Sequence, residues 1–423
     1  MISQSSLVAF VARIEQQVLP SFIHIAKQVE QNQRRVLDAF KAEYVQEFHF
    51  AASTGYGYGD TGRDALEAVY ARVFGTEGAI VRPSITSGTH AIAASLFGVL
   101  RPGDELLYIT GKPYDTLEEV IGEKGDGRGS LRDYGIVYND VPLKAGRPDW
   151  EAISRSIGAK TKCIGIQRSR GYSDRPSFTV EEIAEMVRFV KEIKGDVIVF
   201  VDNCYGEFVE TEEPPHRGAD LIAGSLIKNP GGGLAKSGGY IAGKRTLLEQ
   251  VAARLTAPGV GVEGGAMYGY TRDYFQGFFL APHVVGEALK GAVLTAAVLE
   301  KLGFDTSPRW HDTRTDLIQQ INFGSAEALV AFCQGIQMAS PIDAHVVPVP
   351  GPMPGYEDPV IMAAGTFVQG STIELSVDGP LRPPHTGYMQ GGLTYAHVKI
   401  ALETALAHMA AQGQIKDVPA GTI

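Results

Sequence analysis

The chain has 423 residues, of which 44% are hydrophobic and 20% charged, so it can fill a large core in the manner of an ordinary globular protein. Its formal net charge of -10 argues against a nucleic-acid-binding protein, which would carry a basic surface. That charge leaves small acidic ligands open, because one local arginine outweighs a mildly acidic surface.

Three cysteines, Cys163, Cys204 and Cys333, follow no metal-ligand spacing. We expect each to be buried as a small apolar residue, and so few cysteines indicate a reducing compartment. The first residues lack a basic start followed by a long apolar run, and the uncharged stretches are short or broken by glycine and proline. The sequence therefore predicts a cytoplasmic protein without a signal peptide or a membrane span.

The N-terminal part is predicted to be helical. Apolar residues at helical spacing indicate a helix over residues 7–47, with one break at Pro20. The glycines in "STGYGYGDTGRDALE", residues 53–67, favour a loop. Thr61 and Asp64 are the candidate caps of the helix that follows this loop.

From residue 78 onward, short apolar runs alternate with amphipathic segments. Helices are expected over 89–100 and 178–195, the second with Thr179 and Glu182 at capping-box spacing. Strands are expected over 78–85, 105–110, 162–167, 196–202, 219–227 and 238–243. This alternation predicts βαβ units and an α/β fold, with a mostly parallel sheet covered on both faces.

The C-terminal part is predicted to be a smaller α+β domain. A long apolar helix over 283–303 leads into it. The remainder contains a helix over 325–339, a strand pair over 360–369 and 371–377, and a final helix. The expected division is an N-terminal arm and loop (1–60), a large cofactor-binding domain (61–290) and a small domain (291–423).

The segment "GSLIKNPGGGLAKSGGYIAG", residues 224–243, holds two lysines among many glycines. A phosphate-binding P-loop would need a second glycine where Ala235 precedes Lys236, so that pattern is broken. Ser225 and Lys228 match the S-x-x-K motif of acyl enzymes, but the S-D-N and K-T-G motifs that accompany it do not occur.

A third interpretation makes Lys228 the lysine that forms a Schiff base with pyridoxal phosphate. That cofactor also needs a carboxylate for its ring nitrogen, small residues at a helix N-terminus for its phosphate, and an aromatic ring to stack on it. Asp202 ends an apolar strand and would supply the carboxylate. The phosphate and stacking candidates are Ser87, Gly88, Thr89 and Tyr114.

These residues carry a resemblance to a known family. The order "TSGTHA", "VDNCYGEF" and "GSLIKNPGGGLAKSGGYIAGK" resembles the fold type I (aspartate aminotransferase-like) pyridoxal-phosphate enzymes. Together with "GYGYGDTGRDALE", "QRSRGYS" and "QGGLTY", it is similar to the aluminium resistance, or methionine γ-lyase family, proteins. These are relatives of the Cys/Met metabolism enzymes, and the likeness covers most of the chain.

The resemblance implies a role for each motif residue. Lys228 would bind the cofactor, Asp202 its ring nitrogen and Ser225 its phosphate. In the Cys/Met enzymes a Tyr-x-Arg motif reaches the phosphate in the neighbouring subunit. Tyr58 or Tyr56 is the candidate for that contact, and Tyr56 is also a candidate for one to the substrate. The arginine is absent, because Asp60 stands in its place; Arg63 is a candidate substitute.

A second departure concerns the substrate carboxylate. The Cys/Met enzymes bind it with an arginine where this chain has Glu374, and a carboxylate repels another carboxylate. Arg382 is the candidate replacement, which leaves methionine uncertain as the substrate.

The expected activity is that of a pyridoxal-phosphate lyase acting on a sulfur-containing or similar γ-substituted amino acid, with Lys228 as the base. Lys228 suits this role if burial lowers its pKa toward neutrality. β-Elimination, transamination and racemisation use the same machinery and stay open. A non-catalytic cofactor-binding or metal-tolerance protein is a further alternative, although no dense carboxylate cluster is present and no metal site is expected. The resemblance implies a homodimer or homotetramer with shared active sites.

Overall fold

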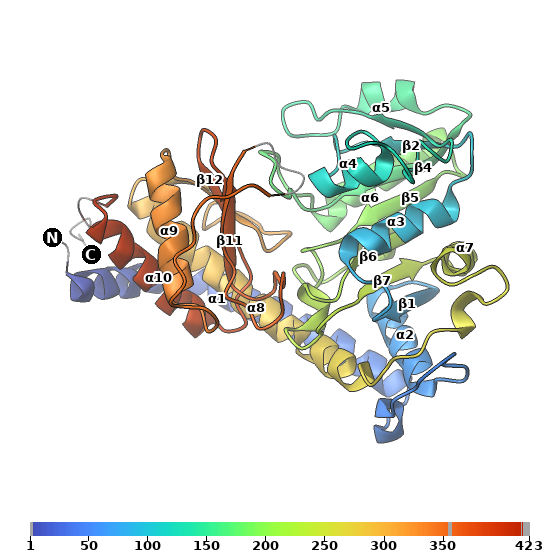
Figure 1. The fold of residues 1–423 in the computed structure, drawn as a ribbon, viewed down its shortest axis with the longest axis horizontal. Coiled ribbons are helices and arrows are strands. Elements are labelled where there is room, and N and C mark those ends of the chain that lie inside the picture. Colours follow the sequence, from blue (N-terminus) through green and yellow to red (C-terminus); the bar gives the residue numbers. More distant parts are fainter. Residues whose placement is uncertain (1–2, 354–357, 416, 418–423) are drawn as a thin grey trace. The chain divides into compact units, whose positions relative to one another are not determined.

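The computed structural model describes residues 3–353, 358–415 and 417. The chain folds into two compact units (Figure 1). The large unit comprises residues 32–280, and the C-terminal unit comprises residues 1–31 together with 281–423. The three-part division expected from the sequence stays a prediction.

The large unit contains a seven-stranded sheet with the order β1-β7-β6-β5-β4-β2-β3. The strands are β1 (Gly78–Arg82), β2 (Glu105–Tyr108), β3 (Val137–Asp140), β4 (Thr161–Gln167), β5 (Ile198–Asp202), β6 (Leu221–Ser225) and β7 (Gly239–Gly243). Strands β2 to β6 run parallel, whereas β7 is antiparallel to both of its neighbours. The connection from β6 to β7 carries no crossover α-helix, so the chain returns antiparallel. The predicted α/β fold with a mostly parallel sheet is confirmed.

Six helices of the large unit accompany this sheet (Figure 1). They are α2 (Thr61–Phe74), α3 (Gly88–Val99), α4 (Asp115–Ile121), α5 (Trp150–Ser156), α6 (Val180–Ile193) and α7 (Arg245–Leu255). Helices α3 and α7 pack on each other, and both contact β7. Gly98 permits this approach, because a Cβ there would lie only 2.7 Å from Val251 Cα. The short 3-10 helices are η1 (Glu47–Phe50), η2 (Pro214–Arg217), η3 (Asn229–Gly231) and η4 (Gly261–Glu263).

Helix starts agree with the sequence in one case and differ in another. The Thr179 hydroxyl accepts from the Glu182 N–H and the Glu182 carboxylate accepts from the Thr179 N–H, so the predicted capping box of α6 is confirmed. Helix α2 is capped by Asp60, whose carboxylate accepts from the Arg63 N–H, rather than by Thr61 or Asp64. Asp60 has the extended backbone that an N-cap needs, whereas Thr61 is already helical.

The N-terminal helix α1 (Gln4–Ala42) passes through Pro20 without a break, so the predicted interruption is wrong. Pro20 is exposed, and so is Gln16, whose carbonyl loses its helical donor and faces water instead. Buried residues on both sides of the proline, Val18 and Ile25 among them, continue the same apolar face. Burial of this face outweighs the one lost hydrogen bond.

The C-terminal unit has a five-stranded antiparallel sheet with the order β10-β11-β12-β9-β8. Its elements are α8 (Thr271–Lys301, beginning in the large unit), β8 (Asp305–Ser307), β9 (Gln319–Asn322), α9 (Ala326–Met338), β10 (Val360–Ala363), β11 (Ser376–Pro380), β12 (Thr386–Gln390) and α10 (Tyr395–Ala411). Helices α9 and α10 pack closely at Gly335, where a Cβ would lie 2.4 Å from Ala405 Cα. The expected α+β character is confirmed, with three strands more than the sequence predicted.

Helix α8 is long and apolar enough to span a bilayer by length and mean hydropathy alone. However, 83% of its most apolar 18-residue window is buried inside the protein, as in a core helix.

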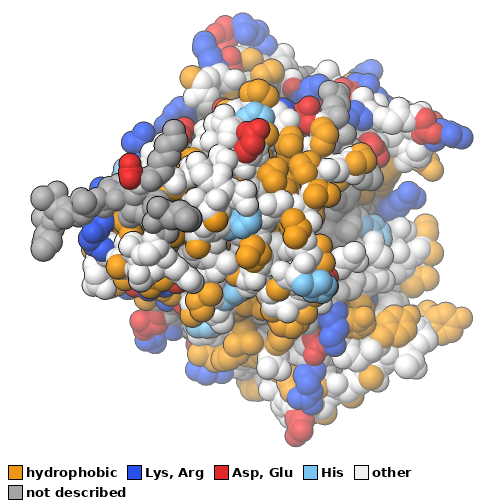
Figure 2. Space-filling view, turned by 60° about the vertical axis from the view of Figure 1, so that its left-hand side comes forward, with side chains coloured by type: hydrophobic (Ala, Val, Ile, Leu, Met, Phe, Trp, Pro, Cys, Tyr) orange, Lys and Arg blue, Asp and Glu red, His pale blue; other side chains and the backbone are white. Residues whose placement is uncertain are grey.

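On the face drawn in Figure 2, acidic and basic side chains lie near one another around the edge, and hydrophobic side chains are spread between them.

Candidate active site

Parallel strand ends bring Asp202 and Lys228 to one edge of the large sheet. Asp202 is the last residue of β5 and lies beside Gln167, the last residue of β4. Strand β6 ends at Ser225, and Lys228 follows just before η3. Carboxyl ends of parallel strands are where α/β proteins present ligand-binding groups. The structure thus places both predicted residues at the edge where the sequence analysis expects them.

The Asp202 carboxyl is deeply buried and only partly compensated. It is 5% exposed, and one oxygen accepts a hydrogen bond of 3.1 Å from the Cys204 N–H. Burial raises the pKa of Asp202, and the attraction of the Lys228 ammonium offsets this effect only in part. An additional cation at this carboxyl would therefore be stabilised.

The Lys228 amine lies over an aromatic ring that the sequence analysis did not single out. Its Nζ is 3.9 Å from the centroid of the Tyr205 ring. Burial acts to lower the pKa of Lys228, but the negative charges that Cys204, Tyr205 and Asp202 carry at the high pH where this amine titrates outweigh burial and raise the pKa above its usual value. The expectation of a pKa lowered toward neutrality is wrong for the chain by itself, because these acidic groups surround the amine.

The N-terminus of α3 forms a tight cradle beside these residues. Ser87 caps the helix, and its hydroxyl accepts from the His90 N–H at 3.0 Å. A Cβ at Gly88 would lie 3.2 Å from Ser225 Cβ and 3.3 Å from Cys204 Sγ, so a larger residue would crowd the cradle. The first N–H groups of a helix have no partner within it and suit an anion.

Tyr114 joins this cradle from the turn before α4. Its hydroxyl is 2.8 Å from the Thr89 hydroxyl, and its backbone N–H donates to the Gln167 side chain at 2.8 Å. Burial, followed by the nearby charge of Asp202, raises the pKa of Tyr114, so its ring is neutral at physiological pH. The structure thus brings together the candidates at positions 87–89, 114, 202, 225 and 228.

Cys204, Tyr205 and Asn229 are neighbours of the site that the sequence analysis missed. Burial, with the charge of Asp202, raises the pKa of the Cys204 thiol, which is therefore neutral. Cys204 and Tyr205 come shortly after the end of the strand at Asp202, separated from it by Asn203, and that position was the available signal. Asn229 gave no signal, because its role depends on a distant loop.

Tyr56 and Tyr58 lie apart from this cluster. They are 79% and 62% exposed, and their rings stack with centroids 5.5 Å apart. Within the described residues, no hydrogen bond or ring contact joins either tyrosine to Lys228 or Asp202. The chain by itself therefore does not place these two predicted residues in the site.

Arg63 does not replace the arginine that the Tyr-x-Arg motif lacks in this chain, because its guanidinium donors are already used. Its side chain is 1% exposed, and one guanidinium nitrogen donates to the carbonyls of Gly57, Glu263 and Gly265. A salt bridge of 2.9 Å to Asp64 uses the other terminal nitrogen. Arg63 therefore fastens the loop of residues 53–60, which carries Tyr56 and Tyr58 and is called the tyrosine loop below, to the segment before α8.

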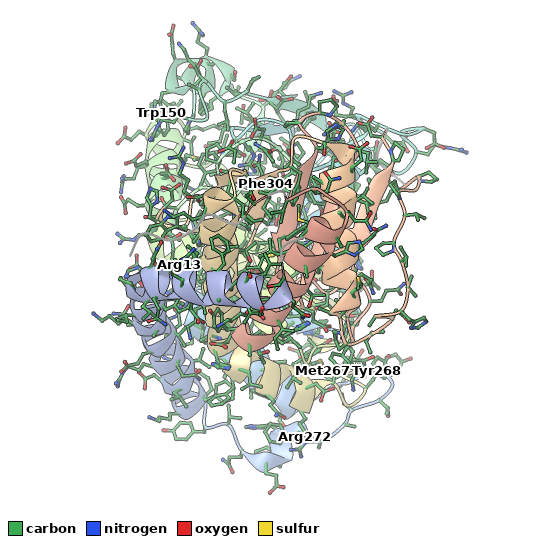
Figure 3. The ribbon with its side chains drawn as sticks, turned by 90° about the vertical axis from the view of Figure 1, so that its left-hand side faces the viewer. Arg13, Trp150, Met267, Tyr268, Arg272 and Phe304 are labelled. Atoms are coloured by element: carbon green, nitrogen blue, oxygen red, sulfur yellow. The ribbon has the colours of Figure 1, made fainter. Side chains whose placement is uncertain are left out.

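The segment before α8 adds further attachments to the tyrosine loop. The Met267 N–H donates to the Ser53 hydroxyl and the Tyr268 N–H to the Ser53 carbonyl. Arg272, at the start of α8, lies 4.6 Å from the centroid of the Phe50 ring. Figure 3 labels Met267, Tyr268 and Arg272 along this segment. The loop is held in a defined shape with its two stacked tyrosines outward.

Glu374 has a structural task in the C-terminal unit. It is 3% exposed, and its carboxylate accepts from the Phe367 and Val368 N–H groups at 2.8 and 2.9 Å. The carboxylate therefore fastens a loop. Arg382 follows β11, with its side chain 56% exposed and 3.4 Å from the Asp358 carboxylate. Its role toward a substrate stays a prediction.

The alternative interpretations of the glycine-rich segment gain no support. Lys236 is 68% exposed and forms a salt bridge of 3.0 Å with Asp273 on α8. Ser225 lies against Gly88, where a Cβ would be 3.2 Å from Ser225 Cβ, and this position belongs to the cradle. Across the described parts of the chain, no group of three or more His, Cys, Asp or Glu side chains is arranged to hold a metal ion.

Residues 7–410 match the family model described as methionine gamma-lyase. Protein YnbB of Bacillus subtilis (strain 168), itself uncharacterised, is 61% identical over 388 residues, which cover 90% of this chain and 92% of YnbB. A solved structure from Listeria monocytogenes, provisionally named a cystathionine beta-lyase involved in aluminium resistance, is 58% identical with a TM-score of 0.93, covering 95% of this chain and 99% of that one. The pyridoxal-5'-phosphate-dependent protein YhfS of Escherichia coli shares the fold, with a TM-score of 0.62, 16% identity and coverage of 90% and 97%.

The fold is that of the fold type I pyridoxal-phosphate enzymes. The chain belongs to the methionine gamma-lyase family, a family of pyridoxal-phosphate-dependent carbon–sulfur lyases.

The residues at the sheet edge fit this cofactor. The incompletely compensated carboxyl of Asp202 suits a protonated ring nitrogen, and the cradle at Gly88 has the unpartnered helix N–H groups that a phosphate requires. Lys228 presents a primary amine between them, and Tyr114 presents a neutral ring. The donor set therefore contains one group for each part of the cofactor.

Proposed function

We propose that this protein is a pyridoxal-phosphate-dependent carbon–sulfur lyase that acts on a sulfur-containing or similar γ-substituted amino acid. The observation that supports it most is the pairing of Asp202 and Lys228 at neighbouring strand ends, next to the helix cradle at Gly88. The family supports the reaction type, since its members are named for carbon–sulfur bond cleavage.

Each residue of the site has one task in this proposal. Asp202 would hold the ring nitrogen, Ser87 to Thr89 with Ser225 the phosphate, and Tyr114 the ring face. When bound, the cofactor supplies a positively charged ring that withdraws electrons from the substrate α-carbon. The Lys228 amine would take the α-proton and return a proton later in the reaction. Because acidic neighbours raise the pKa of Lys228, we expect cofactor capture by this amine to become faster as the pH rises.

The cofactor assignment is tested by reductive trapping. Pyridoxal phosphate is added to the purified chain, borohydride is added, and the digested protein is mapped by mass spectrometry. We expect the phosphopyridoxyl group on the peptide that contains Lys228, because this amine lies beside Asp202 and the cradle. A tag confined to Lys236 or to other lysines, or no tag at all, would contradict the proposal.

The reaction itself is decided by its products. γ-Elimination from methionine or a similar amino acid releases 2-oxobutanoate, whereas β-elimination from cystathionine releases pyruvate. The second activity is a specific alternative, because the relative from Listeria monocytogenes is provisionally named a cystathionine beta-lyase. Pyruvate as the sole oxo acid would reject γ-elimination. If neither 2-oxobutanoate nor pyruvate were formed, the result would point to transamination or racemisation.

We propose further that the protein is a homodimer or homotetramer in which the tyrosine loop completes the site of a neighbouring subunit. The stacked, exposed rings of Tyr56 and Tyr58, on a loop fastened by the buried Arg63, support this arrangement. Three buried free cysteines accord with a reducing compartment, and we propose a cytoplasmic location.

Mixing two defective variants tests the shared site, at a limiting pyridoxal phosphate concentration at which a site without Tyr58 stays largely empty. Tyr58→Ala is expected to weaken cofactor binding about tenfold, the effect of one lost hydrogen bond to a charged group. In hybrids of Tyr58→Ala with Lys228→Ala, one site carries both defects and the other none. Random mixing of dimers should therefore restore about a quarter of the wild-type activity. Tyr44→Ala, which alters another exposed tyrosine, is the matched control. Hybrids without any recovered activity would mean that each subunit supplies its own tyrosine.

A further inference from the structure

The ring of Tyr205 has no role in the proposed function, yet it lies against the Lys228 amine. The separation of 3.9 Å between Nζ and the ring centroid is well within the range of a cation–π contact. Desolvated contacts of this type hold an ammonium group more strongly than exposed ones. Lys228 has a raised pKa, so its amine is protonated at neutral pH and meets the condition for this attraction.

The backbone conformation of Tyr205 indicates that neighbouring contacts hold this residue in place. Its φ angle is +70°, in the left-handed region that residues with side chains rarely adopt. Such a conformation persists only where neighbouring contacts determine it, and it is concentrated at functional sites. The contacts around Tyr205 must therefore account for it.

Asn229 supplies one of these contacts and connects it to the lysine. It directly follows Lys228, is fully buried, and donates from Nδ2 to the carbonyl oxygens of Tyr205 at 3.0 Å and Glu207 at 2.9 Å. The same short segment thus carries the amine and fixes the loop that carries the ring. A shift of either one would break these hydrogen bonds.

Glu207 anchors the other side of the same loop. Its carboxyl accepts from the Tyr240 hydroxyl on β7 at 2.7 Å. Gly224 on β6 leaves the room, because a Cβ there would lie 2.6 Å from the Glu207 carboxyl oxygen. Loop 203–208 is therefore fixed to two strands of the sheet as well as to the lysine segment.

We propose that Tyr205 is a positioning residue that holds the protonated Lys228 amine over its ring face, with Asn229 locking the ring and the amine to each other. This inference rests on the proposed function, in which that amine is the one that meets the cofactor. The contact with the Tyr205 ring stabilises the protonated Lys228 amine and keeps its side chain in one orientation. The amine must then release its proton before it captures the cofactor.

The other titratable groups that face the amine are Cys204 and Asp202, at and after the end of β5, and Tyr114, before α4. Glu207, within the same loop, interacts with the Lys228 charge more weakly. All of these groups stay unchanged in the variants below, so a difference between variants reports the ring.

The test measures how fast the Lys228 amine reacts in the cofactor-free full chain. Trace formaldehyde with cyanoborohydride labels unprotonated amines at pH 9, and the methylated Lys228 peptide is quantified against the Lys236 peptide of the same sample. We expect Tyr205→Phe, which retains the ring face, to react within about twofold of wild type. Tyr205→Leu should react about tenfold faster, which corresponds to a pKa lower by about one unit. Asn229→Leu, which removes the donor, should change the rate in the same direction, by about threefold.

A second reagent separates proton affinity from simple opening of the site. The rate of adduct formation with the larger pyridoxal phosphate is followed by absorbance for the same variants. An equal gain with both reagents supports the proposal, whereas a gain with pyridoxal phosphate alone overturns it. Tyr205→Leu reacting like wild type, or Tyr205→Phe reacting like Tyr205→Leu, overturns it as well. Failure of pyridoxal phosphate to react even with the wild-type chain would reject the proposed function and leave the formaldehyde result standing.

Discussion

Replacing Lys228 with alanine should remove covalent attachment of pyridoxal phosphate and lower lyase turnover by about three orders of magnitude. A positioned general base contributes roughly 10²–10⁴ in rate, and here the same amine also binds the cofactor. The loss corresponds to about 4 kcal/mol of transition-state stabilisation. The measurement is turnover under cofactor saturation, together with the absorbance band of the lysine-bound cofactor.

The chain contains a matched control for this substitution. Lys236 lies in the same glycine-rich segment but is 68% exposed and forms a salt bridge with Asp273. Lys236→Ala should keep turnover within about twofold, because an exposed salt bridge contributes little. If both variants lost activity equally, the loss would reflect damage to the segment. If Lys228→Ala kept the absorbance band, a different lysine would carry the cofactor.

Glu207 should make the stability of the large unit depend strongly on pH. Burial raises the pKa of its carboxyl from the ordinary value of 4.5 to about 8, and one of its oxygens has no hydrogen-bond partner. The folded chain therefore holds a proton that the unfolded chain has already released between about pH 4.5 and 8. Stability from this group is fully present below pH 4.5 and is lost as the pH rises through 8. The loss is on the order of 5 kcal/mol.

Glu207→Gln should remove most of this pH dependence and be more stable than wild type above pH 8. Its amide oxygen can still accept the hydrogen bond that the Tyr240 hydroxyl donates to the carboxyl. Urea unfolding of the cofactor-free chain from pH 5 to 9 measures the effect. In a Trp310→Phe background, Trp150 is the remaining tryptophan and reports on the large unit.

Glu213 provides the comparison for a buried carboxylate that is already paired. It accepts from Arg168 at 3.1 Å and from Asn203 at 3.1 Å, both fully buried. Glu213→Gln should lower stability at every pH by about 3 kcal/mol, because the buried Arg168 loses one of its two carboxylate partners and keeps only Glu210. Equal pH slopes for wild type and Glu207→Gln would show that the Glu207 carboxyl is ionised in the folded chain.

The sequence was sufficient for the outline of the sheet and for the residues at its edge. The apolar runs predicted over 196–202 and 219–227 end at Asp202 and just before Lys228, although β6 itself already ends at Ser225. A buried parallel strand presents its functional groups where such a run stops. The capping box of α6 was also readable, because its two residues are close in the chain. Local patterns are visible when the interacting residues are near one another in sequence.

Other features depended on contacts between distant segments. The continuity of α1 through Pro20 results from burial on both sides of the proline. An arginine is a residue type that binds anions, yet the Arg63 guanidinium donates to backbone carbonyls some 200 residues away. Glu374, which stands where the Cys/Met enzymes have an arginine, likewise uses its carboxylate to fasten a loop. None of these partners can be identified from spacing along the chain.

The sequence by itself determined the α/β class, the strand ends that carry Asp202 and Lys228, and the family of this protein. Only the tertiary structure decided which groups surround the amine: the ring of Tyr205, the amide of Asn229 and the acidic neighbours that raise the pKa of Lys228. The physical reason is that hydrophobic periodicity involves residues close together in the chain, whereas burial and charge at a site depend on every segment that packs around it.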